Sequence, residues 1–273
     1  MVNLKALCRC VLTILLVCVM LTMTACSSVD EGLLPAFGAG KVTTTAPAET
    51  EDPEREPSEK KGITICVDPG HGFEDGGTSS ELLGDVLEKD ITLSVSLKVK
   101  KELELRGFDV ILTHDGETFP KASNDDGNNK FKPQERAAYA NSLGSSIDYY
   151  LSIHCNSFDS PDVTGCIVYY VDEALKGTKG DLDIATEITD TIKKDFEDYK
   201  VTLNTFSYYV IRYTKVPASL VELGFVTNEN DAKNMLDEEW QAKMAVSLAD
   251  ALDKYYSGES DNPDSTEQID PTV

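Results

Sequence analysis

The stretch Ile63-Thr64-Ile65-Cys66-Val67-Asp68-Pro69-Gly70-His71-Gly72 decides how this chain folds. Its apolar first half is typical of a short buried strand, and Pro69-Gly70 then ends that strand in a turn that carries His71. Ile147 to His154 is a second run of this kind, and Ser219 to Leu223 is a third that holds Glu222. In sheets built from such strands the reactive groups gather where strands end and loops begin. The sequence therefore indicates a functional site at these strand ends.

Runs with helical spacing separate the strands. Leu87, Ile91, Val95, Val99 and Leu103 recur every fourth residue, which predicts one helix that stops at Gly107. Further helices are predicted at 134–143, with Gly144 as C-cap, at 184–199 and at 240–255, and further strands at 108–113, 165–171 and 208–213. Strands that alternate with helices predict an α/β fold, a three-layer sandwich with a mostly parallel central sheet flanked by helices.

The charge balance excludes one class of partner. The 273 residues contain 25 Lys and Arg against 48 Asp and Glu, which gives a formal net charge of −23. Such a chain cannot neutralise a run of phosphates, so we expect it to bind no nucleic acid.

The first residues are typical of a secretory signal. Lys5 and Arg9 precede a short apolar run, Val11 to Met23, and Thr24-Ala25-Cys26 follows it. The run is shorter than the roughly 20 residues that span a bilayer. Small residues directly before Cys26 resemble a bacterial lipobox, which implies cleavage before Cys26, a lipid on its sulfur and an extracytoplasmic lipoprotein anchored to the membrane. An uncleaved membrane anchor and an ordinary secretion signal are the alternatives.

Composition divides the chain into four parts. Residues 1–25 are the predicted signal peptide, and residues 26–61 join the lipidated Cys26 to a Pro-rich flexible tether. Residues 62–256 contain all the predicted strands and helices and form one domain. Residues 257–273 hold Ser, Asp, Glu and Pro without a basic residue, which predicts a disordered acidic tail.

Four ionisable residues carry the chemistry of the predicted site. His71 and His154 follow or end strands, Glu222 lies within an apolar strand, and Glu88 precedes the first predicted helix. A carboxylate in an apolar strand is costly unless it is paired, bound to a metal or protonated, which makes Glu222 the most informative of the four. Two imidazoles and a carboxylate suffice to hold catalytic zinc, and a second carboxylate can act as general base. Taken singly, each residue also has a purely structural interpretation: a turn histidine, a core histidine or a carboxylate at a helix start.

The motifs around these residues resemble one family. Val67-Asp68-Pro69-Gly70-His71-Gly72, Glu88-Lys89-Asp90-Ile91, Ser152-Ile153-His154-Cys155-Asn156 and Val221-Glu222-Leu223-Gly224-Phe225 occur in the order found in the zinc-dependent N-acetylmuramoyl-L-alanine amidases, the amidase_3 family. Arg136 to Asn141 is similar to the family's Arg…Ala-Asn helix. The resemblance covers residues 62–256, and it implies a zinc amidase domain with His71, Glu88 and His154 as ligands of Zn²⁺ and Glu222 as general base. The implied reaction hydrolyses the amide between N-acetylmuramic acid and L-alanine in bacterial peptidoglycan.

Two positions depart from the family pattern. Cys155 stands where Ala is usual, and His114 stands where Arg is common after Thr113. Because side chains alternate along a strand, we expect Cys155 to point away from His154, and we interpret His114 as a loop histidine more than a substrate contact. Cys66, Cys155 and Cys166 are expected to be buried free thiols, with one disulfide and one free thiol as the alternative. Asp68 is a candidate to hydrogen-bond a ligand imidazole or to form the turn, and Asn156 and Arg212 are weaker candidates for substrate contact.

Two other functions compete with the amidase hypothesis. One is a non-catalytic wall-binding or regulatory module on the same fold, and the other is a different peptidoglycan metallopeptidase. The expected partners are glycan strands and stem peptides, the membrane through the lipid on Cys26, and an activator that the sequence leaves unidentified. We expect the chain to be a monomer.

Overall fold

A single β-sheet forms the middle layer of the computed structural model, which describes residues 56–120 and 130–259. In these residues six strands follow the order β2-β1-β3-β6-β4-β5 across the sheet. The strands are β1 (Thr64–Pro69), β2 (Asp109–Leu112), β3 (Tyr149–Asn156), β4 (Cys166–Tyr170), β5 (Val201–Thr205) and β6 (Ala218–Phe225). The helices are α2 (Glu88–Leu105), α3 (Pro133–Leu143), α4 (Glu173–Lys176), α5 (Asp181–Asp195), α6 (Tyr209–Arg212), α7 (Glu229–Leu236) and α8 (Glu238–Ser257), with 3-10 turns η1 (Glu81–Leu83) and η2 (Gly144–Ser146).

The sheet is mostly parallel, as predicted. β1, β2, β3 and β6 run in one direction, while β4 pairs antiparallel with β6 and parallel with β5. After β1 the chain passes through α2 to β2, which pairs with one edge of β1. The next strand, β3, pairs with the opposite edge of β1. This reversal of strand order opens a crevice at the carboxyl ends of β1 and β3, the usual place for a ligand in an open α/β sheet.

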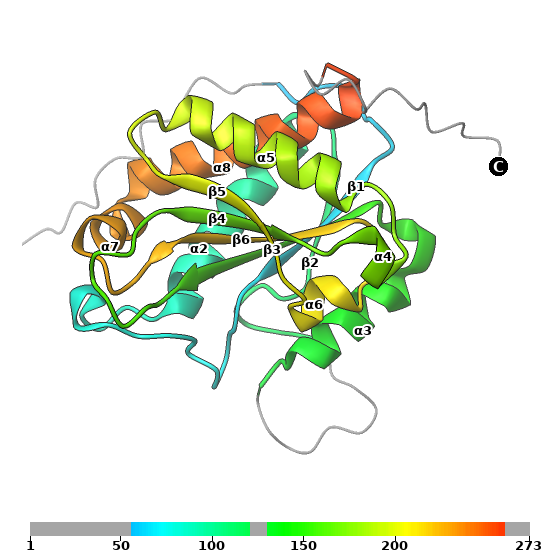
Figure 1. Cartoon of the computed structure of the whole chain (residues 1–273). Helices are drawn as coiled ribbons and strands as arrows, with labels where there is room; N and C mark the ends of the chain where they lie inside the picture. The colour runs from blue at the N-terminus through cyan, green and yellow to red at the C-terminus, as the bar shows by residue number, and fades with distance from the viewer. Residues whose placement is uncertain (1–55, 121–129, 260–273) are drawn as a thin grey trace, which may run out of the picture. The chain divides into compact units, whose positions relative to one another are not determined.

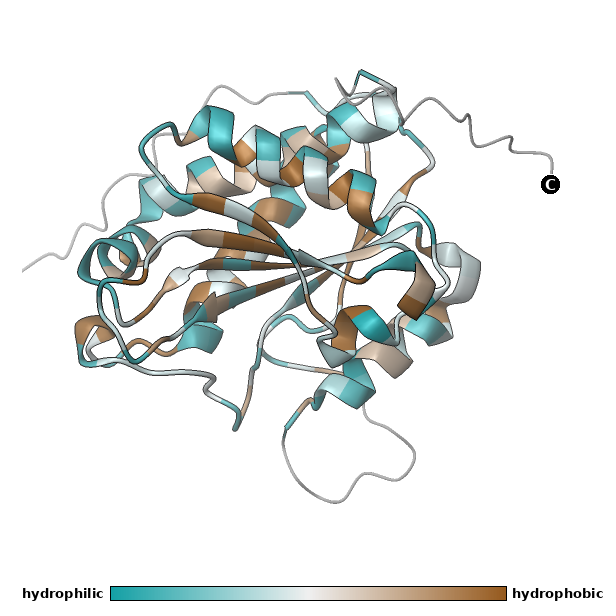
Figure 2. Cartoon of the chain, viewed as in Figure 1, coloured by the Kyte–Doolittle hydropathy of each residue, from teal (hydrophilic) through white to brown (hydrophobic). Residues whose placement is uncertain are grey.

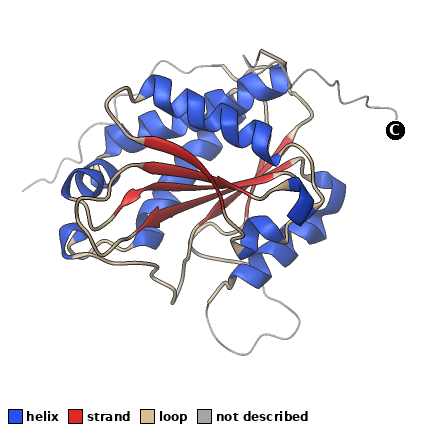
Figure 3. Ribbon diagram, viewed as in Figure 1, coloured by secondary structure: helices blue, strands red, loops and turns tan. Residues whose placement is uncertain are grey.

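Helices cover both faces of the sheet (Figures 1 and 3). One face packs on α2, α5 and α8 and buries Ile65, Val67, Leu151 and Ile153, while the other packs on α3 and α6 and buries Cys66, Tyr150 and Leu220. Consecutive strand residues thus enter opposite cores, which explains why β1 and β3 read as continuous apolar runs. Figure 2 shows the same arrangement, with hydrophobic strands inside and hydrophilic helix faces outside. The expected three-layer α/β sandwich is confirmed.

The structure corrects one predicted strand. Residues 208–213, predicted as a strand, contain the single helical turn α6, and the strand of this region is β5, seven residues earlier. Tyr, Val and Ile favour strands, but here the neighbouring residues Val210 and Ile211 are both buried. One helical turn packed on α3 can bury two consecutive side chains. A strand with only one buried face cannot, because its side chains alternate between the two faces. The alternation of Val201 and Leu203 with Thr202 and Asn204 was the available signal for β5.

The remaining boundaries differ little from the sequence predictions. The helix predicted at 184–199 runs from Asp181 to Asp195, and α7 was not predicted. Gly144 is the C-cap of α3, with φ at 59°, as expected. None of the helices in residues 56–120 and 130–259 is long and apolar enough to cross a bilayer. The predicted signal peptide and Cys26 lie outside the described residues.

Candidate metal and catalytic site

His71 is held in place by a strained loop after β1. Both His71 and Phe73 adopt left-handed backbone angles, with φ at 63° and 58°, which non-glycine residues rarely do. The buried guanidinium of Arg136 compensates for this strain, because it donates to the carbonyl of Pro69 at 2.7 Å and to the carbonyl of His71. A residue of α3 therefore fixes the backbone that carries the imidazole.

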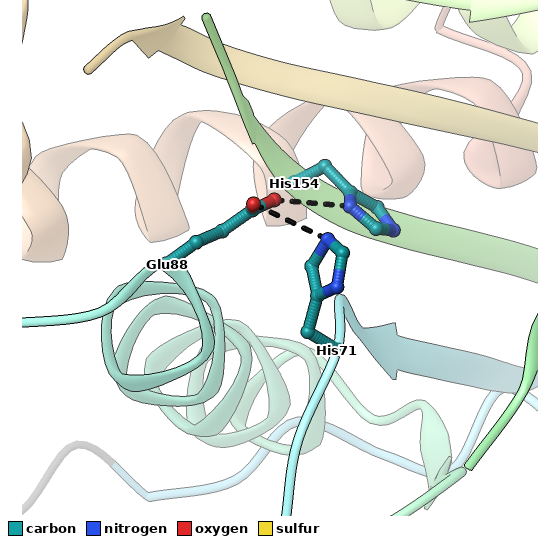
Figure 4. A group of neighbouring side chains, drawn as sticks. All are labelled: His71, Glu88 and His154. Atoms are coloured by element: carbon teal, nitrogen blue, oxygen red, sulfur yellow. Dashed lines mark hydrogen bonds and ion pairs between the residues drawn. The ribbon is translucent and has the colours of Figure 1, made fainter. Parts of the chain in front are cut away.

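Glu88 faces both imidazoles from the first turn of α2. Its Oε2 lies 3.2 Å from Nε2 of His71, and its Oε1 lies 3.1 Å from Nδ1 of His154 (Figure 4). Backbone N–H groups also orient the carboxylate, since Thr78 donates to Oε2 at 2.7 Å and Cys155 donates to Oε1 at 2.9 Å. The side chain is 1% exposed. Although burial opposes it, the pKa of Glu88 is held well below its usual range by His154 and His71.

Glycines allow this close packing around the imidazoles and Glu88. A Cβ on Gly70 would lie 2.7 Å from the ring of His154, and a Cβ on Gly77, whose φ is +75°, would lie 2.5 Å from Oε2 of Glu88. Any larger residue at either place would push the ring or the carboxylate away. The two imidazoles themselves meet edge to face, with ring centroids 5.0 Å apart.

His71, Glu88 and His154 form a group that could hold a metal ion. Each offers one ligand atom, and these atoms lie within 4.8 Å of one another. Two imidazole nitrogens and a carboxylate oxygen are the donor set of a catalytic zinc centre, and in that respect these residues fit Zn²⁺. The structure thus brings together the three residues that the sequence resemblance implied as ligands.

Asp75 was missed by the sequence reasoning. Its Oδ2 lies 3.0 Å from Nδ1 of His71, on the side of the ring away from Glu88. A carboxylate in this position fixes the tautomer and the orientation of a metal-binding imidazole. Although burial opposes it, Glu88 and Asp75 together raise the pKa of His71 above its ordinary value. An acidic residue four positions after a histidine in a glycine-rich loop was the signal available in the sequence.

Asp68 has a different role from the two predicted for it. Its carboxylate accepts hydrogen bonds from Thr113 at 2.6 Å and from Ser152 at 2.8 Å, and it lies 3.3 Å from the guanidinium of Arg136. These partners come from the end of β2, from β3 and from α3. Asp68 therefore joins the elements around the site, and its hydrogen bonds and ion pairs among the described residues include neither imidazole of the potential metal-binding group.

Glu222 lies beside the potential metal-binding group. It occupies the register position opposite His154 on the neighbouring parallel strand, so both side chains point to the α3 and α6 face. The side chain is 6% exposed, and among the described residues its Oε2 has no hydrogen-bond partner. Burial and then the charge of Glu88 raise the pKa of Glu222 to about 8. A carboxyl group with this environment can hold or release a proton near neutral pH.

A cavity of about 130 Å³ lies at the site, and its ionisable lining includes His71, Asp75, His154 and Glu222. The rest of its lining comes from α3 and from the segment around α6, namely Pro133, Arg136, Tyr208, Tyr209, Val210 and Leu220. The cavity is thus mostly apolar with a few converging polar groups, as in small-molecule and enzyme sites.

The other candidates lie outside this arrangement. Cys155 belongs to the core on the α2 and α8 face, so its side chain points away from His154 as predicted, and burial raises the pKa of its thiol. Cys66 and Cys166 are also buried free thiols. His114 is buried and its Nε2 lies 2.9 Å from the carbonyl of Pro69, beneath the loop that carries His71. Asn156 accepts from the backbone of Ser157, and Arg212 is not among the residues that line the cavity.

The strand ends of this α/β sheet bring a potential metal-binding group next to a buried carboxylate. This combination of groups is typical of the active site of a metal-dependent hydrolase. Comparison with known proteins identifies the family. The family model described as N-acetylmuramoyl-L-alanine amidase matches residues 65–254, which is more than half of the chain. The protein therefore belongs to the N-acetylmuramoyl-L-alanine amidase family.

Individual relatives support the same assignment. The N-acetylmuramoyl-L-alanine amidase LytC of Bacillus subtilis (strain 168) is 30% identical over 195 residues, which are 71% of this chain and 36% of LytC. Among solved structures, N-acetylmuramoyl-L-alanine amidase AmiC2 of Nostoc punctiforme is similar with a TM-score of 0.60 and 30% identity, covering 72% of this chain and 99% of AmiC2. The CwlD amidase from Clostridioides difficile, solved in complex with the GerS lipoprotein, gives a TM-score of 0.57 and 26% identity over 72% of this chain and 100% of CwlD.

Proposed function

We propose that this protein is a zinc-dependent amidase that hydrolyses the bond between N-acetylmuramic acid and L-alanine in peptidoglycan. The observation that carries the proposal is the position of Glu222 on β6, in one cavity with His71 and His154 and in register with His154. Membership of the amidase family and the likeness to amidases of known structure support the choice of substrate.

The proposed zinc ligands are His71, Glu88 and His154. When bound there, Zn²⁺ would supply a Lewis acid that acidifies water and polarises a carbonyl. The chain supplies the geometry: Arg136 fixes the loop of His71, Asp75 fixes its ring, and two backbone N–H groups fix Glu88.

Glu222 is the proposed general base and acid. Its carboxylate takes a proton from the attacking water while a carbon–oxygen bond forms at the lactyl carbonyl. The same carboxyl then gives that proton to the alanine nitrogen as the carbon–nitrogen bond breaks. The products are a free lactyl carboxylate on the sugar and a stem peptide with a free amino group, so one water is consumed for each bond that is cut.

Digestion of purified peptidoglycan tests this function directly. Mass spectrometry of the digest should show intact stem peptides and lactyl carboxylates on the glycan. Shortened stem peptides would instead indicate a peptidase, and glycan retained without any released peptide would indicate a wall-binding module. Zinc content measured on the same preparation should be close to one ion per chain.

We also propose that the lipid on Cys26 anchors the enzyme outside the cytoplasm, with the residues between Cys26 and Ser58 as a tether. Residues 58–61, which were expected to belong to the tether, pack on the domain, and their place there supports an outward-facing site. The backbone N–H groups of Ser58 and Lys61 donate to the carbonyls of Leu105 and Gly107, at 2.9 Å each, next to the start of β2. The chain therefore enters the domain at the amino end of β1, and His71 lies just beyond its carboxyl end. Replacement of Cys26 by Ser should release the protein from membranes, whereas a membrane-bound Cys26→Ser variant would favour an uncleaved anchor.

We further propose that the protein is a monomer and that an accessory protein activates it. Size-exclusion chromatography with light scattering would measure the oligomeric state.

A further inference from the structure

Aromatic side chains gather beside the catalytic cavity. The segment from the end of β5 through α6 carries Phe206, Tyr208, Tyr209 and Tyr213, which we call the aromatic patch. Tyr208 and Tyr209 line the cavity, whereas Phe206 and Tyr213 lie outside its lining and are each 55% exposed. Tyr209 is itself 39% exposed, so the patch continues from the cavity wall onto the surface. Contiguous exposed aromatic side chains of this kind commonly mark a binding surface.

The rings of the patch pack against one another in two pairs. The centroids of Phe206 and Tyr208 are 4.5 Å apart, and those of Tyr209 and Tyr213 are 4.3 Å apart. Tyr208 also meets Tyr169 of β4 edge to face at 5.1 Å. Since each ring packs against a neighbouring ring, the contacts restrict the motion of the aromatic faces that the patch presents.

The backbone beneath the patch is anchored from two sides. Val210 and Ile211 of α6 are buried in the core on the α3 face. The side chain of Asn141 donates to the carbonyl of Tyr213 at 2.8 Å and accepts from the backbone of Lys215 at 2.8 Å. A surface held in this way binds a ligand at a smaller entropic cost than a free loop does.

We propose that the aromatic patch binds sugar rings of the glycan strand next to the muramic acid whose amide is cut, an inference that rests on the proposed amidase function. A pyranose ring offers an apolar C–H face with hydroxyl groups at its rim, and a tyrosine offers an apolar face with a hydroxyl at its edge. The four residues of the patch carry no charge. The glycan of an amide-linked muramic acid is uncharged, whereas the stem peptide carries carboxylates, so the patch matches the glycan side of the substrate.

The continuity of the patch with the cavity decides where these sugars lie. Tyr209 belongs both to the cavity lining and to the pair with Tyr213. A muramic acid with its amide at Glu222 would therefore place the neighbouring sugars of the strand along the patch. Because Tyr209 and Tyr213 are 39% and 55% exposed, neither ring serves only to pack the core.

Binding to chitin, an insoluble and uncharged polymer of N-acetylglucosamine, tests this inference without requiring catalysis and without the lactyl carboxylates that peptide-free wall glycan would carry. The double variant Phe206→Ala, Tyr213→Ala should bind chitin about tenfold more weakly than the native protein in a sedimentation assay, because two stacking surfaces are lost. The ring-preserving double variant Phe206→Tyr, Tyr213→Phe should bind within about threefold of the native protein, since it keeps both aromatic faces. Leu182→Ala serves as the control, because Leu182 is 47% exposed on α5, which covers the opposite face of the sheet.

Kinetics with two substrates separate the glycan from the stem peptide as the bound group. One substrate is a long glycan strand that carries stem peptides, and the other is a muramoyl peptide with a single sugar. The double alanine substitution should raise KM more for the first substrate than for the second. The ring-preserving variant should have the KM of the native protein. An equal rise with both substrates would assign the patch to the stem peptide and overturn the inference. Unchanged binding of chitin by the double alanine variant would also overturn it.

The same digests separate this inference from the proposed function. Intact stem peptides from the native enzyme, together with normal glycan binding by the double alanine variant, would leave the amidase function standing and refute the patch alone. Shortened peptides from the native enzyme would refute the amidase function, whatever the glycan binding shows.

Discussion

His154 and Glu222 stand opposite each other on the neighbouring parallel strands β3 and β6. This register places a potential metal ligand and a buried carboxylate side by side on one face of the sheet. The two residues are far apart in the sequence, and their spatial proximity depends on the pairing of β3 with β6. The arrangement gives Glu222 a position from which it can act as a base without serving as a ligand.

Replacement of Glu222 by Gln should lower kcat by about 10² to 10⁴, the usual contribution of a general acid–base residue. The amide is similar in size, and Oε2 has no partner to lose among the described residues, so the fold and zinc content should be unchanged. Assays of peptide release and metal content check both expectations. Glu229→Gln is the matched control, because Glu229 is an exposed carboxylate on α7 paired only with Lys233 in the structure. A Glu222→Gln enzyme with full activity would exclude the proposed role.

Replacement of His154 by Ala should remove bound zinc and activity together, because one of the three proposed ligands is lost. Metal analysis after dialysis measures the loss directly, without an activity assay. Lys233→Ala is the control, since that exposed side chain on α7 pairs with Glu229 and lies outside the proposed ligand group. If His154→Ala kept a full complement of zinc, the ligand assignment would be wrong.

Asp75→Asn should weaken zinc binding by about 10- to 100-fold, as is usual when a partner of a metal-binding imidazole is changed. The carboxylate lies 3.0 Å from Nδ1 of His71, and a neutral amide would no longer favour the same ring orientation as strongly. Competition with a chelator of known affinity gives the change in Kd. Asp115→Asn is a control in the same half of the domain, because Asp115 bonds only to its own loop among the described contacts. Equal affinities for both variants would argue that Asp75 does not orient the ligand.

Asp68→Asn should lower the free energy of unfolding at pH 7 by about 3–5 kcal/mol, because the buried Arg136 would lose its charged partner. Although burial opposes it, Arg136, Thr113 and Ser152 hold the pKa of Asp68 below its ordinary value of 3.8. A depressed carboxyl pKa stabilises the fold above the unfolded value, and this stability is lost as pH falls through the folded value.

The difference between the native protein and Asp68→Asn should therefore be largest above pH 4 and shrink at lower pH. Denaturant unfolding at several pH values measures it. A difference that stays constant down to pH 2 would contradict the charge-based explanation and favour a loss of packing alone.

Local sequence predicted much of the fold because its strongest signals are periodic. The stripe from Leu87 to Leu103 and the apolar runs of β1 and β3 are long enough to specify their own elements. Tyr208 to Tyr213 is short and rich in residues that favour strands, yet it forms α6 because Val210 and Ile211 are buried together against α3. The conformation of such a short segment depends on contacts that a local pattern does not contain.

The sequence by itself determined the types of residue in the site and the ends of the strands where they lie. His71, Glu88, His154 and Glu222 could be named from motifs, because each motif is a local arrangement of a strand or helix end. Only the tertiary structure decided which groups orient them. Asp75 meets His71 within the loop after β1, where the folded loop turns the two side chains toward each other. Asp68 joins β2, β3 and α3, and Arg136 holds the loop after β1, through contacts between separate elements. Those contacts follow from the order of strands in the sheet, which local hydrophobic periodicity does not encode.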